Sequence, residues 1–182
     1  MVRWGTKLGA IALAGMMAGG CQAGSEAAMA GPLGGDGSIE RPFEVGMAGD
    51  VGDWQIRLVG TVPEAEAVLV HWNWFNRPAR PGMTYVMFEV EAVYRGTGSS
   101  QPWNDLYFGI AGPSRVAYDN FESDCGLFPE DLVNQGEAFT DGVMLGRVCW
   151  EVRSSDLAGL LVFVENRDDE TASPIFFTPP ET

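Results

Sequence analysis

MTYVMFEVEAVY, residues 83–94, is the longest stretch of the chain in which side chains alternate as a half-buried strand requires. Successive side chains of a strand point to opposite faces. A helical period of 3.6 residues would scatter the two glutamates instead of gathering them on one side. The stretch therefore predicts a central strand with one dry face and one mostly wet face. The dry face would carry Val86, Phe88, Val90, Ala92 and Tyr94, and the wet face Tyr85, Met87, Glu89 and Glu91.

Several shorter segments also have the composition of strands, and glycine, proline and aspartate turn signals separate them. Residues 119–140 are expected to form a long irregular loop with one helical turn near 130–134. Because no amphipathic segment of helical length is present, the pattern predicts an all-β fold, an antiparallel sandwich of about seven or eight strands. The expected strands besides the central one are residues 42–45, 54–60, 106–111, 116–118, 143–152, 160–164 and 175–177.

The N-terminal segment has the pattern of an export signal. Arg3 and Lys7 precede an apolar run of about ten residues, which is shorter than the roughly 20 that a transmembrane helix needs. Small residues at 18–20 then stand directly before Cys21, and this arrangement resembles the lipobox of prokaryotic lipoproteins. The resemblance implies that residues 1–20 are a lipoprotein signal peptide and that Cys21 carries acyl chains, which would hold the protein on the outer face of the membrane. An ordinary secretory signal is the alternative.

The chain has three cysteines. If Cys21 carries the lipid, Cys125 and Cys149 remain as an even pair in an oxidising compartment, where a disulfide is expected. Two buried thiols are the alternative, and the spacing is not that of a Cys-x-x-Cys redox motif. We therefore predict one disulfide between Cys125 and Cys149.

Charge and composition limit the partners and divide the chain. The net charge is −14, and the loss of Arg3 and Lys7 with the signal would make the rest two units more negative. Nucleic acid is therefore not expected as a partner, and membrane attachment must come from the lipid on Cys21 because no basic patch is available. Residues 21–40, rich in Gly and Ala, are predicted to be a flexible tether. Residues 41–182 suffice for one domain.

The order of residues in this domain resembles the telokin-like, immunoglobulin-like family catalogued as domain of unknown function 4352. The resemblance is carried by FEVG at 43–46, GDWQIRL at 52–58, PGMTYVMFEV at 81–90, and GE at 136–137 with the strand at 142–152. The chain departs from the family at 95–98, where RGTG replaces Asn-x-Gly, and at 153–154, where a proline is common. The resemblance implies an immunoglobulin-like β-sandwich on an exported, often lipid-anchored protein. It supplies no catalytic residue.

Residues 68–75, VLVHWNWF, hold the strongest candidate for a binding surface. Trp72, Trp74 and Phe75 stand close to Arg77 and Arg80, and exposed Trp and Arg side chains are enriched in binding hot spots. The alternative, which the alternation of the run favours, is an extra edge strand whose rings pack into the core.

Residues suited to catalysis or metal binding are sparse. His71 is the only histidine and is expected on the surface of a strand, which excludes any site that needs two imidazoles. No Gly-x-Ser-x-Gly motif is present. Asp119, Glu122 and Asp124, and separately the acids at 168–170, do not follow EF-hand spacing. We expect solvated acidic loops, without a metal or cofactor.

These patterns predict a non-enzymatic, lipid-anchored immunoglobulin-like module that meets a protein or ligand at the cell envelope. The alternative is an exported carrier of a small ligand or metal ion. A carrier requires an apolar cavity between the sheets, whereas an interaction module requires a filled core and an exposed apolar surface. An enzyme ranks third, since it would need paired carboxylates that only folding brings together.

Overall fold

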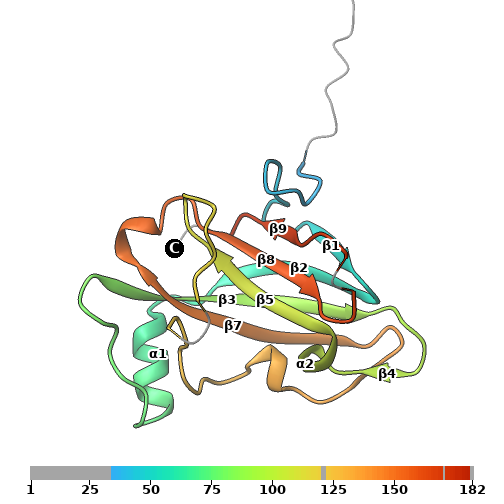
Figure 1. The fold of residues 1–182 in the computed structure, drawn as a ribbon. Helices are drawn as coiled ribbons and strands as arrows, with labels where there is room; N and C mark the ends of the chain where they lie inside the picture. Colours follow the sequence, from blue (N-terminus) through green and yellow to red (C-terminus); the bar gives the residue numbers. More distant parts are fainter. Residues whose placement is uncertain (1–33, 120–121, 170, 181–182) are drawn as a thin grey trace, which may run out of the picture. The chain divides into compact units, whose positions relative to one another are not determined.

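The structure, a computed structural model, describes residues 34–119, 122–169 and 171–180. Within these residues, two antiparallel sheets pack face to face, one of four strands in the order β1-β2-β3-β7 and one of three strands in the order β5-β8-β9 (Figure 1). This arrangement confirms the predicted antiparallel β-sandwich. The strands are β1 (Ala48–Val51), β2 (Trp54–Thr61), β3 (Met83–Tyr94), β5 (Leu106–Ala111), β7 (Val143–Arg153), β8 (Leu161–Asn166) and β9 (Ile175–Phe177).

Short elements connect these strands. A small ribbon pairs β4 (Ser99–Ser100) with β6 (Ala138–Phe139). The helices are α1 (Ala65–Trp72) and α2 (Pro102–Asp105), and the 3-10 turns are η1 (Leu132–Asn134) and η2 (Ser154–Asp156). The turn η1 lies where a helical turn was predicted in the long loop.

Strand β3 occupies the interior of its sheet, as the alternation of residues 83–94 predicts. It pairs with β2 along one edge and with β7 along the other. All five side chains of the predicted dry face are buried, from Val86 to Tyr94. Large side chains such as Trp54, Phe88 and Phe177, each at most 1% exposed, fill the space between the sheets. The interior is therefore a packed hydrophobic core.

A second apolar cluster lies on the outer face of the four-stranded sheet. Met87 was predicted on the wet face, yet it is fully buried. It packs in a cluster with Val62, Ala65, Leu69 and Cys125, which come from α1, the residues before it and the loop that holds the cysteine. The expectation that no helix would be present is wrong, because residues 65–72 form a helix that covers this face.

Two predicted short strands are reduced to single bridges. Phe43, in the predicted strand 42–45, makes one parallel bridge to Phe177, and the first strand of the fold is β1 instead. Ala117, in the predicted strand 116–118, makes one antiparallel bridge to Ala111. Each segment gives only one bridge, so neither adds a full strand.

The folded unit begins before the boundary predicted at residue 41. The described residues from 34 onward belong to one compact unit. Gly37 is buried, and its carbonyl accepts a hydrogen bond from Phe176 N at 2.8 Å. The signal peptide, Cys21 and most of the predicted tether lie outside the described residues. Among the residues that the structure does describe, no helix is long and apolar enough to cross a bilayer.

Candidate functional site

The aromatic residues singled out in the sequence lie on the surface, at the end of α1 and in the loop that follows it. Trp72, the last residue of α1, is 60% exposed, and Trp74 and Phe75 are 82% and 69% exposed. The rings of Trp74 and Phe75 stack with their centroids 3.9 Å apart. The interpretation that these rings fill the core is therefore wrong, and the alternative of an exposed surface holds.

The packing of α1 explains why the aromatic side chains remain outside. Ala65 and Leu69, four residues apart, are the buried residues of this two-turn helix, so they form the face that packs on Met87. The helix ends when Asn73 adopts an extended conformation, while its N–H still bonds to the carbonyl of Leu69 at 3.2 Å. After Asn73 the chain continues as a loop, and the side chains of residues 74 and 75 stay exposed to solvent.

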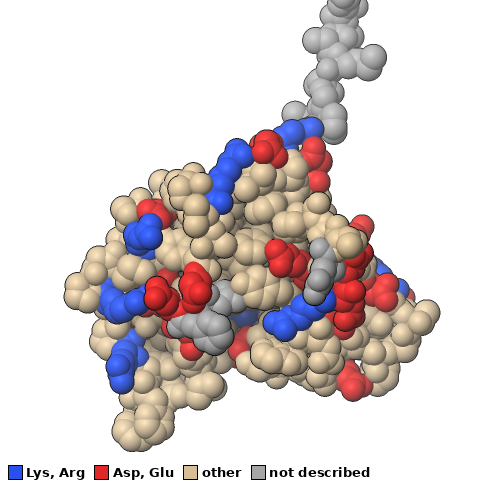
Figure 2. All heavy atoms as spheres, in the orientation of Figure 1, with Lys and Arg blue, Asp and Glu red and all other residues tan. Residues whose placement is uncertain are grey.

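A side chain far along the sequence completes this surface. Leu127, in the loop that contains Cys125, is 65% exposed. With Trp72 and Phe128 it lines one hollow, so the two segments are neighbours in space. We call Trp72, Trp74, Phe75 and Leu127 the aromatic tip. In the orientation of Figure 1, the lobe under α1 consists mainly of uncharged atoms (Figure 2).

Asn76 fixes the two segments of the aromatic tip to each other. Its amide nitrogen donates to the carbonyls of Leu69, at 2.9 Å, and Leu127, while its Oδ1 accepts from Leu127 N at 3.2 Å. Gly126 makes this approach possible, because its φ is +73° and a Cβ there would lie 2.5 Å from the Asn76 oxygen. The surface is thus held in one arrangement before any partner arrives.

The predicted disulfide is confirmed and supports the same loop. Cys125 and Cys149 are bonded, with Cα atoms 5.9 Å apart, and they join the loop to strand β7. Cys125 is buried in the cluster beneath α1. Backbone hydrogen bonds from Arg147 N to Glu130 O and from Glu151 N to Ser123 O add to this attachment. The loop therefore covers the edge of β7 and backs the aromatic tip.

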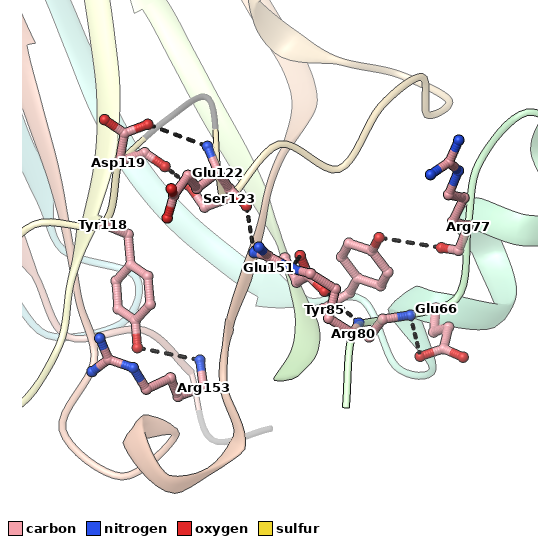
Figure 3. A network of polar contacts seen from close by, with 11 residues as sticks. Glu66, Arg77, Arg80, Tyr85, Tyr118, Asp119, Glu122, Ser123, Glu151 and Arg153 are labelled. Carbon is pink, nitrogen blue, oxygen red and sulfur yellow. Dashed lines mark hydrogen bonds and ion pairs between the residues drawn. The ribbon is translucent and has the colours of Figure 1, made fainter. Parts of the chain in front are cut away.

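The two arginines predicted beside the aromatic residues have different roles. Arg80 is committed to structure, since its Nε lies 2.8 Å from Glu151 Oε2 and its backbone N donates to the other carboxylate oxygen at 2.6 Å. Glu151 is only 4% exposed, so this ion pair anchors the loop after α1 to β7 (Figure 3). Arg77 is exposed, and its carbonyl accepts from Tyr85 Oη at 3.2 Å.

A polar groove of about 630 Å³ opens at the end of the sandwich where β3 begins and β7 ends. Its lining includes Arg80, Glu151, Tyr118, Arg153 and Asp156, most of which Figure 3 shows. Tyr118 donates to Asp156, and this hydrogen bond lowers the pKa of the Asp156 carboxyl. Burial, followed by that bond, raises the pKa of Tyr118. Arg153 lies 3.4 Å from Asp156, so the central charges of the groove are paired.

A second hollow, of about 490 Å³, runs beside the aromatic tip and is called the tip groove below. Trp72, Leu127 and Phe128 supply its apolar lining, while Glu130 and Asp131 supply its charged groups. Glu130 pairs with Arg147 at 3.1 Å. Burial raises the pKa of Asp131, although hydrogen bonds from neutral donors partly oppose the shift. Asn134 and Gln135 complete the lining.

Of the remaining predicted candidates, Asp119 and Glu122 lie together in the lining of the polar groove, where Glu122 N donates to Asp119 Oδ1 at 3.2 Å. His71 is exposed on α1 and not on a strand. Asp169 accepts hydrogen bonds from Thr171, which lower the pKa of its carboxyl, and Glu170 lies outside the described residues. Within 34–119, 122–169 and 171–180, no three His, Cys, Asp or Glu residues are arranged to hold a metal ion.

Sequence reasoning missed Asn76, Leu127 and the acids of the tip groove. Leu127 follows Gly126 in a loop of 22 residues that gave no periodic signal, so nothing in the sequence connected it to Trp72. Asn76 directly follows the aromatic run in the sequence, but nothing in the sequence indicated that it contacts Leu127.

Comparison with known proteins concerns the fold. No family model matches the chain. No curated protein sequence matches it either. Three solved structures are similar, each with a TM-score of 0.44. They are a conserved hypothetical protein from Bacillus anthracis (8% identity), an uncharacterized β-sandwich protein from Clostridium difficile (10%) and the YjhA protein from Bacillus subtilis (7%). The matches cover 74%, 75% and 75% of this chain and 94%, 93% and 99% of those chains, in the same order. The resemblance to the telokin-like family stays a prediction.

Proposed function

We propose that the chain is a non-enzymatic, lipid-anchored module that binds a partner in the cell envelope through its aromatic tip. The observation that carries this proposal is the exposure of four large apolar side chains from two segments that Asn76 holds together. A folded protein rarely presents such side chains together on one surface unless they take part in an interaction.

The composition and rigidity of the tip both favour binding. Trp is among the residues most enriched in binding hot spots, and its large ring carries little rotamer entropy for its contact area. Because Asn76 and the disulfide already fix the loop positions, less conformational freedom is lost when a partner docks. Burial of the stacked Trp74 and Phe75 rings would remove much apolar surface from water.

The position of the tip suits an outward-facing module. In Figure 1 the N-terminal part of the described domain lies by β9 and β1, whereas α1 lies at the other end of the domain. Phe43 bridges Phe177, which places the start of the domain against β9. The predicted flexible tether between Cys21 and the domain would let the aromatic tip reach a partner away from the lipid anchor.

The interior of the fold supports an interaction module over a carrier. A carrier needs apolar space between the sheets, and here Trp54, Phe88 and Phe177 occupy that space. In the polar groove, Glu151 and Asp156 are engaged in ion pairs with Arg80 and Arg153, which favours a structural role for these four side chains. Both features are consistent with a structural frame that displays the tip.

The test replaces Trp74 and Phe75 together by serine in the native cells and follows partner capture by in-cell crosslinking. Phe139→Ser is the matched control, because Phe139 is 68% exposed on β6, outside the tip. We expect the crosslinked partner to disappear from the tip variant and to persist in the control, with both proteins folded by circular dichroism. Equal capture by both variants would contradict the proposal.

A further inference from the structure

The tip groove has an apolar side and an acidic side, and this combination defines the chemistry of what fits it. Trp72, Leu127 and Phe128 form the apolar side. The only charged residues in the lining are Glu130 and Asp131, so an occupant meets carboxylates and no guanidinium or ammonium group from the lining itself.

The negative charge of Asp131 has no cation paired with it. None of the ion pairs among the described residues involves Asp131, whose carboxylate accepts hydrogen bonds from Val133 N, at 3.2 Å, and from the Asn134 side-chain amide. Glu130 is paired with Arg147, yet its carboxylate is 65% exposed and accessible to a second cation. The groove therefore offers an unneutralised carboxylate beside an aromatic ring.

Other classes of occupant use only part of this lining. A polyanion is repelled by the two carboxylates and by the net charge of the chain, −14. An acyl chain would contact the apolar side but would remove water from the carboxylates without pairing them. A neutral glycan can stack on Trp72 and donate its hydroxyls to the carboxylates, but it leaves their negative charge without a cation. A Lys or Arg side chain satisfies both sides, because its cation can pair with Asp131 while its methylene stem or its charge packs on an aromatic ring.

We infer that the tip groove receives a Lys or Arg side chain from a basic, apolar segment of a partner protein, while the stacked Trp74 and Phe75 rings enter an apolar pocket beside that segment. The inference rests on the proposed function and names the chemistry of its partner. The acidic chain adds long-range attraction that raises the association rate with such a basic surface.

The binding test uses the full-length protein in phosphatidylcholine nanodiscs and a short labelled peptide of alternating lysine and leucine, followed by fluorescence anisotropy. We expect saturable binding that weakens as salt is raised from ~0.05 M to ~0.3 M. A matched peptide with glutamate in place of lysine should not bind, and chitin oligosaccharides should not compete. Equal binding of the glutamate peptide, or preferential binding of the oligosaccharide, would overturn the inference.

Variants localise the binding to the groove. Glu130→Gln should weaken binding of the lysine peptide. The double variant, which adds Asp131→Asn, should weaken that binding by about tenfold or more. Glu137→Gln, an exposed acid on the side of the β4–β6 ribbon, is the control and should leave the affinity unchanged. No change in the double variant would overturn the inference. If Asp131→Asn unfolds the protein, Glu130→Gln alone still gives the test.

The native partner separates this inference from the proposed function. Capture in cells could depend on Trp74 and Phe75 but be insensitive to Glu130→Gln and Asp131→Asn. In that case the tip binds a partner, and the inference that the partner supplies a basic segment is wrong. If capture is insensitive to the aromatic variant as well, the proposed function itself fails.

Discussion

At the scale of the single residue, Glu130 combines a strained backbone with a place in the tip groove. Its φ is +60°, in the left-handed region that costs an ordinary residue about 1–2 kcal/mol. In its ion pair with Arg147, the glutamate side chain is 65% exposed and the arginine side chain 21% exposed, so solvent screens the pair only in part. Glu64, Arg115 and Asp141 share this conformation, so strain alone assigns no role, and the inferred binding of a basic segment is what would give the Glu130 carboxylate a function.

Glu130→Gly tests this interpretation. We expect the free energy of unfolding to stay within about 1 kcal/mol of wild type, because relief of strain offsets the greater freedom of glycine in the unfolded chain. Binding of the lysine peptide should fall sharply. Urea unfolding and anisotropy on the same preparation give the two readouts. A large loss of stability would instead assign Glu130 a structural role.

Asp131 predicts a pH dependence of stability. Burial raises the pKa of its carboxyl above 3.8, the ordinary value, so the folded protein takes up this proton at a higher pH than the unfolded chain. The ionised form is therefore penalised at pH 7, and the penalty is relieved as pH falls through the raised pKa toward 3.8. The nearby charge of Asp124 acts in the same direction.

The pH dependence can be isolated with Asp131→Asn, which keeps an acceptor for Val133 N. The free energy of unfolding of the variant, relative to that of wild type, should be higher at pH 7 than at pH 4, as measured by urea unfolding at both values. Glu137→Gln, whose carboxylate is exposed, supplies the baseline. A stability difference that is the same at both pH values, or that grows on acidification, would show that burial of Asp131 carries no penalty.

At the scale of the element, α1 shows where sequence patterns lose their power. The eight residues AEAVLVHW place only Ala65 and Leu69 in the buried face, which is too few to reveal a 3.6-residue period. The alternation in VLVHWNWF, residues 68–75, favoured an edge strand instead. The exposed Trp72 then extended the apparent alternation. Only the tertiary contact with Met87, itself predicted on a wet face, explains the helix.

Asn76→Ala tests whether the tip is preorganised. The loss of its hydrogen bonds to Leu69 and Leu127 should lower the free energy of unfolding by about 1–2 kcal/mol, and hydrogen exchange at the amide of Leu127 should accelerate. Gln55→Ala removes two exposed side-chain hydrogen bonds, one donated to Asp50 and one accepted from Arg95, and serves as the control. Unchanged exchange at Leu127 would mean that the disulfide and the backbone hydrogen bonds to β7 hold the loop without Asn76.

At the scale of the whole molecule, the sequence predicted the two sheets (the layers) better than the helix and loops that pack on their outer face (the coverings). β3 and β7 have buried and exposed residues in strict alternation over part of their length, so the positions of Phe88, Val148 and Trp150 follow from a period of two. The segments that cover the outer face depend on contacts between distant residues, such as Leu127 with Asn76. The two sides of the candidate site come from such segments, and for this reason the sequence indicated only its aromatic half.

The disulfide tests this division between layers and coverings. Replacing Cys125 and Cys149 together by serine opens a connection between residues 24 apart and should cost about 3 kcal/mol. Hydrogen exchange should rise mainly in residues 122–131 and α1, while β5 and β8 keep their protection. Uniform loss of protection across both sheets would show that the disulfide stabilises the core itself.

Attachment of the module to a membrane is the last prediction, and it depends on a residue outside the described part of the chain. Cys21→Ser removes the thiol that would carry the diacylglycerol, and the acidic domain has no basic patch to replace it. We expect the variant to leave the membrane fraction and to lose incorporation of a labelled fatty acid, while Cys125→Ser with Cys149→Ser keeps both. Because the tip groove does not involve Cys21, the released protein should still bind the lysine peptide with unchanged affinity. Retention of Cys21→Ser in the membrane fraction would contradict the lipid anchor and require another means of attachment.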